Sequence, residues 1–162
     1  MNNECAIFTK VDQAMMDLRC KVFVEEQGVP LALELEDDES QFLHICKYAP
    51  KDKAQSKSVL VAYARVGFLG GVLHTDGSVQ EICQKTAHIG RVAVDNKWRG
   101  KGYGASVMDG AERLIALAGY SIADLSAQLT AKDFYEKRGY VAYGKEYVDA
   151  GMLHIRMKKD LH

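Results

Sequence analysis

A glycine-rich turn at residues 99–104 constrains this chain more than any other segment. The six residues read Arg-Gly-Lys-Gly-Tyr-Gly, and they stand between a β-branched run at 89–94 and a helical pattern that begins at Tyr103. Glycine has no Cβ, so the backbone can approach a ligand closely, and the free N–H groups at a helix start carry partial positive charge. A strand, a glycine turn and a helix in this order predict a site for a phosphate group.

The size and charge of the chain favour a single globular domain over residues 1–162. Its 162 residues are 48% hydrophobic, which is enough to bury a core. The 21 Lys and Arg residues balance 22 Asp and Glu residues, so no global positive field favours nucleic acid or a membrane surface. Residues 1–10 lack a signal-peptide pattern, and no run approaches the roughly 18 apolar residues of a membrane span. We expect a cytoplasmic protein.

The cysteines give no sign of a metal or redox site. No two of them form a C-x-x-C pair, and their spacing is wide and uneven: Cys5, Cys20, Cys46 and Cys83. We expect reduced, mostly buried thiols that behave as small apolar residues, and no bound metal.

Hydrophobic spacing predicts helices and strands along the whole chain. Strands are expected at 5–8, 42–48, 59–68, 89–94, 121–126, 141–147 and 152–157, and helices at 11–27, 103–118 and 131–138. The segments 42–48 and 59–68 should pair as a hairpin, and Asp76-Gly77 is a turn signal for a second small hairpin inside the connection 69–87. The acidic run 34–39 predicts a solvated loop, because its like charges repel one another.

The glycine turn fits two kinds of nucleotide site. Gly100-x-Gly102-x-x-Ala105 matches a dinucleotide fingerprint, with Asp124 about 20 residues further on to bind a ribose. Two observations argue against an NAD(P)-binding oxidoreductase. The polar turn at 95–99 separates the strand from the glycines, and only 38 residues follow Asp124, which is too few to complete a doubly wound sheet. The other pattern is Arg99-x-x-Gly102-x-Gly104.

Two further motifs accompany this second pattern. They are Gln128-x-x-Ala131-x-x-Phe134-Tyr135-x-x-x-Gly139-Tyr140 and Arg19-x-x-Val22-Phe23-Val24-x-Glu26-Gln27, the latter followed by the acidic run and His44. With them the chain resembles the GNAT superfamily of acyl-CoA-dependent N-acetyltransferases, and within it the ElaA-like branch. The resemblance spans nearly the whole chain and breaks at 69–87, where this sequence is longer.

The resemblance implies an α/β (α+β) fold, with a mixed, mostly antiparallel central sheet flanked by helices. It implies acetyl-CoA as cosubstrate and Tyr135 as the acid that protonates the leaving thiolate, since a phenol pKa of about 10 is close to the thiol value of about 8.5. The residues that it places at the coenzyme are Val92, Ala93, Val94, Arg99, Gly100, Lys101, Gly102, Tyr103, Gly104, Gln128 and Phe134.

The acceptor would be a primary amine, either on a small molecule or at a lysine or N-terminal position of a polypeptide. An ammonium group must lose a proton before it attacks, and several side chains could take that proton. The candidates are Glu26, Glu34, Glu36, His44, His88 and His154, of which His154 matches a histidine of ElaA-like relatives. The acidic run could attract a cationic amine. Small members of the family often form homodimers, and a CoA-binding sensor without turnover remains the non-enzymatic alternative.

Overall fold

The computed structural model describes residues 4–50, 58–68, 72–73, 79–80 and 86–162. Contacts between Cα atoms divide the chain into two compact units. The first unit comprises Met1–Val66 and Arg91–Ala111, and the second comprises Gly67–Gly90 and Glu112–His162. Two strands and one helix therefore begin in one unit and end in the other.

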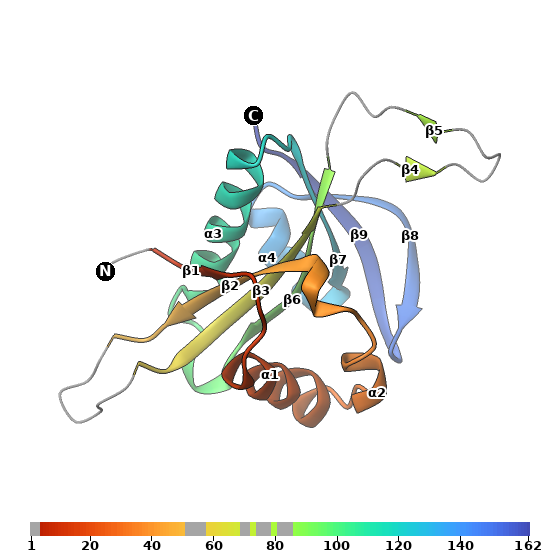
Figure 1. Ribbon diagram of the computed structural model, residues 1–162. Coiled ribbons are helices and arrows are strands. Elements are labelled where there is room, and N and C mark those ends of the chain that lie inside the picture. Colours follow the sequence, from red (N-terminus) through yellow and green to blue (C-terminus); the bar gives the residue numbers. More distant parts are fainter. Residues whose placement is uncertain (1–3, 51–57, 69–71, 74–78, 81–85) are drawn as a thin grey trace. The chain divides into compact units, whose positions relative to one another are not determined.

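The first unit holds the helices and strands of the amino-terminal half, together with the glycine turn (Figure 1). Its elements are β1 (Ala6–Phe8), α1 (Gln13–Arg19), the π-helix η1 (Cys20–Glu26), α2 (Leu31–Glu34), the 3-10 turn η2 (Glu39–Gln41), β2 (Phe42–Tyr48), most of β3 (Leu60–Phe68), the end of β6 (Thr86–Val94), the 3-10 turn η3 (Asn96–Trp98) and the start of α3 (Tyr103–Leu117).

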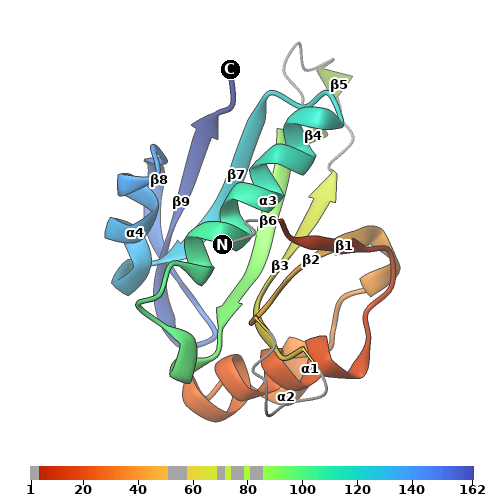
Figure 2. The ribbon, with the colours of Figure 1, turned by 90° about the vertical axis from the view of Figure 1, so that its left-hand side faces the viewer.

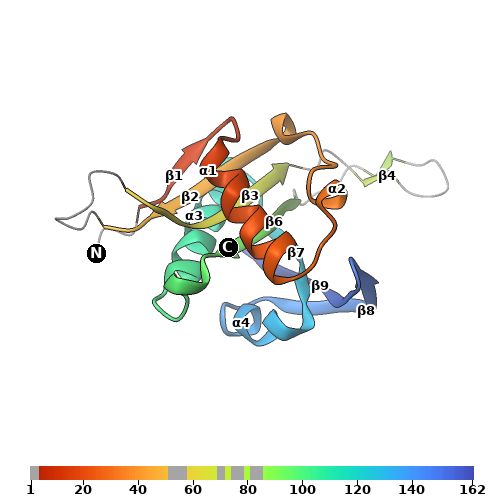
Figure 3. The same cartoon turned by 90° about the horizontal axis from the view of Figure 1, so that it is seen from below.

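Helix α1 is stabilised by an N-cap at its first turn and by burial of an apolar face. The Asp12 carboxylate accepts a hydrogen bond from the Met15 amide at 2.9 Å, which satisfies one of the open N–H groups of the first turn. Met15, Leu18 and Val22 then fall on one face and pack with side chains of β2 and β3. Figure 3 shows α1 lying across these two strands. Burial of this stripe closes the core of the first unit.

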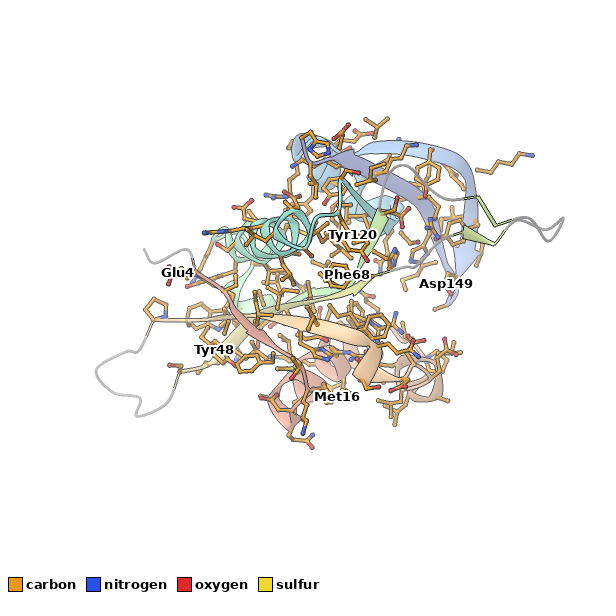
Figure 4. The ribbon with its side chains drawn as sticks, turned by 45° about the horizontal axis from the view of Figure 1, so that its top comes forward. Glu4, Met16, Tyr48, Phe68, Tyr120 and Asp149 are labelled. Carbon is orange, nitrogen blue, oxygen red and sulfur yellow. The ribbon has the colours of Figure 1, made fainter. Side chains whose placement is uncertain are left out.

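The second unit holds the carboxyl-terminal strands and the segment that carries Tyr135. Its elements are β4 (Val72–Leu73), β5 (Val79–Gln80), the start of β6, the end of α3, β7 (Ile122–Gln128), the 3-10 turn η4 (Leu129–Ala131), α4 (Lys132–Lys137), β8 (Val141–Asp149) and β9 (Met152–Asp160). In Figure 2, α4 lies beside β8. The rings of Phe68 and Tyr120, at the ends of β3 and α3, lie 4.8 Å apart between centroids (Figure 4).

The strands of the main sheet run in the order β1-β2-β3-β6-β7-β9-β8, and β4 pairs with β5. β6 and β7 are parallel over Thr86–Ile89 and Ile122–Leu125, with α3 as the crossover between them. The pairs β1–β2, β7–β9 and β8–β9 are antiparallel. The expected mixed, mostly antiparallel sheet flanked by helices is confirmed.

Several sequence expectations need correction in detail. The segment expected as an ordinary helix over 11–27 changes at Cys20 into the π-helix η1, which ends at Glu26 and is followed by Gly28 with φ +73°. Strand β6 begins at Thr86, within the expected connection 69–87. The small hairpin β4–β5 in that connection is confirmed, although its turn at Asp76-Gly77 lies outside the described residues. The helix expected over 103–118 ends at Leu117, and Ala118 is exposed beyond it.

The described cysteines are free thiols, as expected. Cys46 is buried, and burial raises its pKa to about 12, so it stays protonated and unreactive. Cys5 and Cys20 are only half-buried, and Cys83 lies outside the described residues. None of the helices in the described parts of the chain combines the length and hydropathy of a membrane-spanning segment.

Candidate active site

The glycine turn leads from β6 into α3 through two residues with left-handed backbone conformation. Gly100 has φ +74° and Gly102 has φ +85°, values that side chains with a Cβ rarely adopt. A Cβ added at either glycine would meet no protein atom within 4 Å. The surface in front of this turn is therefore open, while the first N–H groups of the 15-residue helix α3 supply partial positive charge there.

The cations of the turn have partners within the first unit. Arg99 donates from Nη2 to Glu26 at 2.8 Å and from Nε to the Val94 carbonyl at 3.1 Å. The Lys101 ammonium lies 5.0 Å from the centre of the Trp98 ring, in cation–π geometry. The turn is thus held in shape, and Glu26 serves as the partner of Arg99. Sequence reasoning treated Glu26 as a candidate base and missed this pairing.

The strand before the turn is bent at Arg91. This residue has φ +52°, in the left-handed region, and its Nε lies 3.0 Å from Glu34 Oε2. The pairing of β6 with β7 covers Thr86–Ile89, whereas β6 continues to Val94. Within the segment 92–94, Ala93 is buried in the core of the first unit, and its neighbours on either side are half-buried.

The acidic run 34–39 is a solvated loop only in part: residues 35–38 are exposed and irregular as expected, whereas Glu34 at one end is buried and Glu39 at the other is half-buried. Glu34 is 1% exposed, and Arg19 is fully buried beside it, with 2.6 Å between Nε and Oε1. Three arginines that are distant in sequence neutralise three of the acids, which removes the repulsion expected from the sequence and reduces any attraction for a cationic amine. The pairs are Arg19 with Glu34 and Glu39, Arg65 with Asp37 and Glu39, and Arg91 with Glu34 and Asp37.

Two of the candidate bases lie in the first unit and have a structural role, because both are buried and paired with other side chains. Glu34 is enclosed by arginines, and His44 is fully buried with its Nδ1 2.6 Å from the Tyr63 hydroxyl. Burial is the main reason why the pKa of His44 is lowered, so this ring stays neutral in the core. Glu36 is exposed. The remaining candidates, His88 and His154, belong to the second unit.

Tyr135 lies on α4 within a cluster of aromatic rings. Its ring centroid is 5.0 Å from that of Phe134 and 5.8 Å from that of Tyr140, both in edge-to-face geometry. The residue is 8% exposed, and among the described residues its hydroxyl has no hydrogen-bond partner. Burial raises the pKa of Tyr135 to about 12. The phenol is therefore neutral and able to donate a proton.

His154 is paired in register with Gln128 and with Tyr147. Its Nδ1 lies 2.8 Å from the Met152 carbonyl, and its ring stacks on Tyr147 at 5.8 Å between centroids. A carbonyl only accepts, so Nδ1 carries the proton and Nε2 carries the lone pair. The Tyr147 hydroxyl in turn forms a hydrogen bond with the Ser126 hydroxyl.

Asp124 is 4% exposed and fully engaged by its own unit. Its carboxylate accepts hydrogen bonds from His88 Nδ1 at 2.7 Å, from Arg156 Nη2 at 2.8 Å and from the Tyr143 hydroxyl. No oxygen is left for a ribose, and the sheet is mostly antiparallel instead of doubly wound and parallel. The dinucleotide interpretation is wrong for this fold.

Comparisons with known proteins agree with this geometry. The model of the acetyltransferase (GNAT) domain family matches residues 31–161. The chain is 31% identical to the N-acetyltransferase YjcF of Bacillus subtilis, over 96% of this chain and 99% of that protein. It is 34% identical to the Bacillus subtilis protein BSU40680, over 88% and 85% of the two chains.

The ElaA protein of Escherichia coli is 28% identical, over 91% of this chain and 86% of its own. Its crystal structure superposes with a TM-score of 0.70, covering 97% of this chain and 100% of that one, at 24% identity. This chain belongs to the GNAT family of acetyltransferases. Within that family it falls in the ElaA-like branch, as its sequence motifs indicate.

Among residues 4–50, 58–68, 72–73, 79–80 and 86–162, no group of three or more His, Cys, Asp or Glu side chains is arranged to hold a metal ion.

Proposed function

We propose that this protein transfers an acetyl group from acetyl-CoA to a primary amine, which attacks the thioester directly. The observation that carries the proposal is the open glycine turn at the start of α3, in a chain of the GNAT family. A doubly charged pyrophosphate is well matched to the N–H groups and dipole of that helix start. The proposal treats residues 1–162 as one catalytic domain, since the family match runs through both units.

The coenzyme contacts follow the order of the chain. The amides of residues 99–104 would hold the pyrophosphate, with charge from Lys101 and from Arg99, which Glu26 fixes in place. The backbone of Val92–Val94, beyond the four residues of β6 that pair with β7, would pair with pantetheine as a further strand does. Gln128 and the half-exposed ring of Phe134 would complete the coenzyme site.

The reaction requires a proton at the departing sulfur. The amine attacks the carbonyl carbon, the C–N bond forms, and the C–S bond breaks as Tyr135 gives its proton to the thiolate. The phenolate then regains a proton from the nitrogen of the new amide, so that CoA leaves as a thiol. Because burial raises the pKa of Tyr135 to about 12, the phenol holds its proton until the thiolate departs. An amide of the segment 92–94 would stabilise the oxyanion.

Calorimetry with acetyl-CoA, CoA and NADH tests the identity of the coenzyme. We expect acetyl-CoA and CoA to bind with one site per chain and NADH to give no heat of binding. Binding of NADH without binding of either CoA species would overturn the proposal.

Replacing Gly102 by valine should weaken acetyl-CoA binding about tenfold or more, or about 1.4 kcal/mol. The new Cβ points into open space that we assign to the pyrophosphate. Gly119 offers a matched control, since it has the same φ of +85° and equally open surroundings at the other end of α3. Gly119→Val should therefore share the backbone strain but keep the affinity, as measured by calorimetry. Equal losses in both variants would show that strain alone is responsible.

Ionisation of Tyr135 should not lower the turnover on the alkaline side of the pH profile. Since burial raises the pKa of Tyr135 to about 12, the phenol keeps its proton at lower pH, and turnover should not fall between about pH 8 and pH 10 through its ionisation. Turnover at saturating acetyl-CoA and amine provides the check. A descending limb in this range that disappears in Tyr135→Phe would contradict the assignment.

A further inference from the structure

The sheet of the second unit has two chemically different faces. On β9, Lys159 turns toward α3, where its ammonium lies 3.1 Å from Glu112 Oε2. Successive side chains alternate between the faces of a strand, so Arg156 and His154 lie on the opposite face from Lys159. The β7 residues Asp124 and Ser126 share that opposite face through their contacts with Arg156 and Tyr147. Both histidines of the second unit that sequence analysis singled out therefore belong to one polar face.

His88 is held on this face by a carboxylate in the neighbouring strand. It is the register partner of Asp124, and its Nδ1 lies 2.7 Å from Asp124 Oδ1. An ionised carboxylate only accepts, so Nδ1 carries the proton and Nε2 carries the lone pair. The side chain of His88 is 31% exposed, whereas that of Asp124 is 6% exposed. A buried carboxylate thus orients an accessible imidazole.

Asp124 does not depend on His88 to be satisfied. Arg156 and the Tyr143 hydroxyl already bind both of its oxygens. Burial alone would raise the pKa of Asp124, but hydrogen bonds from His88, Tyr143 and Arg156 outweigh burial and lower it. The carboxylate is therefore charged, and it can stabilise an imidazolium at His88, as a buried aspartate does in a catalytic triad.

The charged surroundings of His88 come from three strands. Asp124 lies on β7, Arg156 on β9 and Tyr143 on β8. A second cation of β9, the Lys158 ammonium, lies 5.1 Å from the centre of the Tyr143 ring. His154, by contrast, has only a backbone carbonyl at Nδ1 and is 8% exposed. Of the two histidines, His88 has both the access and the carboxylate that a proton acceptor needs.

We propose that His88 accepts the proton that the substrate ammonium must lose before it attacks acetyl-CoA. The inference rests on the proposed acetyltransferase function. The ammonium N–H bond breaks, directly or through one ordered water, and a new N–H bond forms at His88 Nε2. The amine is left with its lone pair, and the imidazolium, balanced by Asp124, later releases the proton to solvent. Tyr135 has a separate task, because it donates a proton to sulfur.

The variant His88→Gln isolates this proton transfer. A glutamine amide can still donate to Asp124, so the contact between β6 and β7 is kept. With an alkylamine, which is protonated at pH 7, we expect kcat/KM to fall about 100-fold and the acid limb of its pH profile to disappear. With an arylamine, which is neutral at that pH, the fall should be less than about threefold.

The matched control is His154→Gln, a histidine of the same sheet face. It should keep the acid limb and show no difference between the two classes of amine. If His154→Gln shows the selective loss, or if His88→Gln loses alkylamine and arylamine turnover equally, the inference is overturned. If the unaltered protein releases no thiol with any amine, the proposed function itself fails, which is a separate outcome.

Discussion

Tyr135→Phe is expected to lower turnover about 100-fold while acetyl-CoA affinity stays within about twofold. The hydroxyl would supply the proton that the departing thiolate needs, and it has no hydrogen-bond partner among the described residues. Its removal should therefore cost little stability, with a melting temperature within about 2 °C of the unaltered protein. Steady-state thiol release and calorimetry measure the two effects. Unchanged turnover would make Tyr135 a packing residue.

Tyr140→Phe is the control from the same aromatic cluster. The Tyr140 hydroxyl donates to Glu112 at 2.9 Å, in a group that also contains Lys159 and Arg138. Its loss should cost about 1 kcal/mol of unfolding free energy but leave turnover per folded molecule unchanged. The two phenylalanine variants should thus show opposite patterns, one catalytic and one structural. A common pattern would mean that the whole cluster acts as a scaffold.

Arg19→Met is expected to cost about 3 kcal/mol of unfolding free energy. Arg19 is fully buried and donates to Glu34 and to Glu39, each at 2.6 Å. Burial alone would lower the pKa of Arg19, but its bonds with Glu39 and Glu34 raise it, so the charge is retained in the fold. Methionine preserves much of the volume and leaves both acids short of a partner. Denaturation with urea, followed by circular dichroism, measures the loss.

Lys21→Met, two residues further along the same helical segment, is the control. Its ammonium pairs with Asp95 at 2.8 Å, but the lysine side chain is 36% exposed. Exposed pairs contribute about 0 to 1 kcal/mol, so this variant should unfold close to the unaltered protein. Equal destabilisation by both variants would show that burial of the Arg19 ion pairs does not increase their contribution to the unfolding free energy.

Local patterns were enough to predict most elements of the fold. The apolar stripe of Met15, Leu18 and Val22, the β-branched run at 89–94 and the glycine turn each depend on residues that are close in sequence. Gly28, Gly100, Gly102 and Gly119 have the positive φ that their positions demand. Residues near one another in the chain interact in any fold, so their spacing is informative before the fold is known.

Long-range pairing could not be predicted in the same way. The run 34–39 looked repulsive because Arg19, Arg65 and Arg91 lie far from it in sequence, and only folding brings them to Glu34, Asp37 and Glu39. The His88–Asp124 pair likewise depends on the register of two parallel strands. No spacing in the sequence marks either group.

The candidate site was predicted in part. The turn at 99–104 stands at the start of α3 as expected, and Tyr135 lies on the short helix expected after 131. The partners of these groups were missed: Glu26 at Arg99, and the polar row around Asp124. The motifs indicated the candidate coenzyme residues, whereas only the fold shows the side chains that orient them.

The most direct test of the proposed function is thiol release from acetyl-CoA on addition of a panel of primary amines, with the acetylated amine identified by mass spectrometry. We expect one CoA thiol for each acetylated amine, and loss of that turnover in Tyr135→Phe. Tight binding of acetyl-CoA without thiol release for any amine or peptide amine would contradict it and favour a CoA-binding sensor.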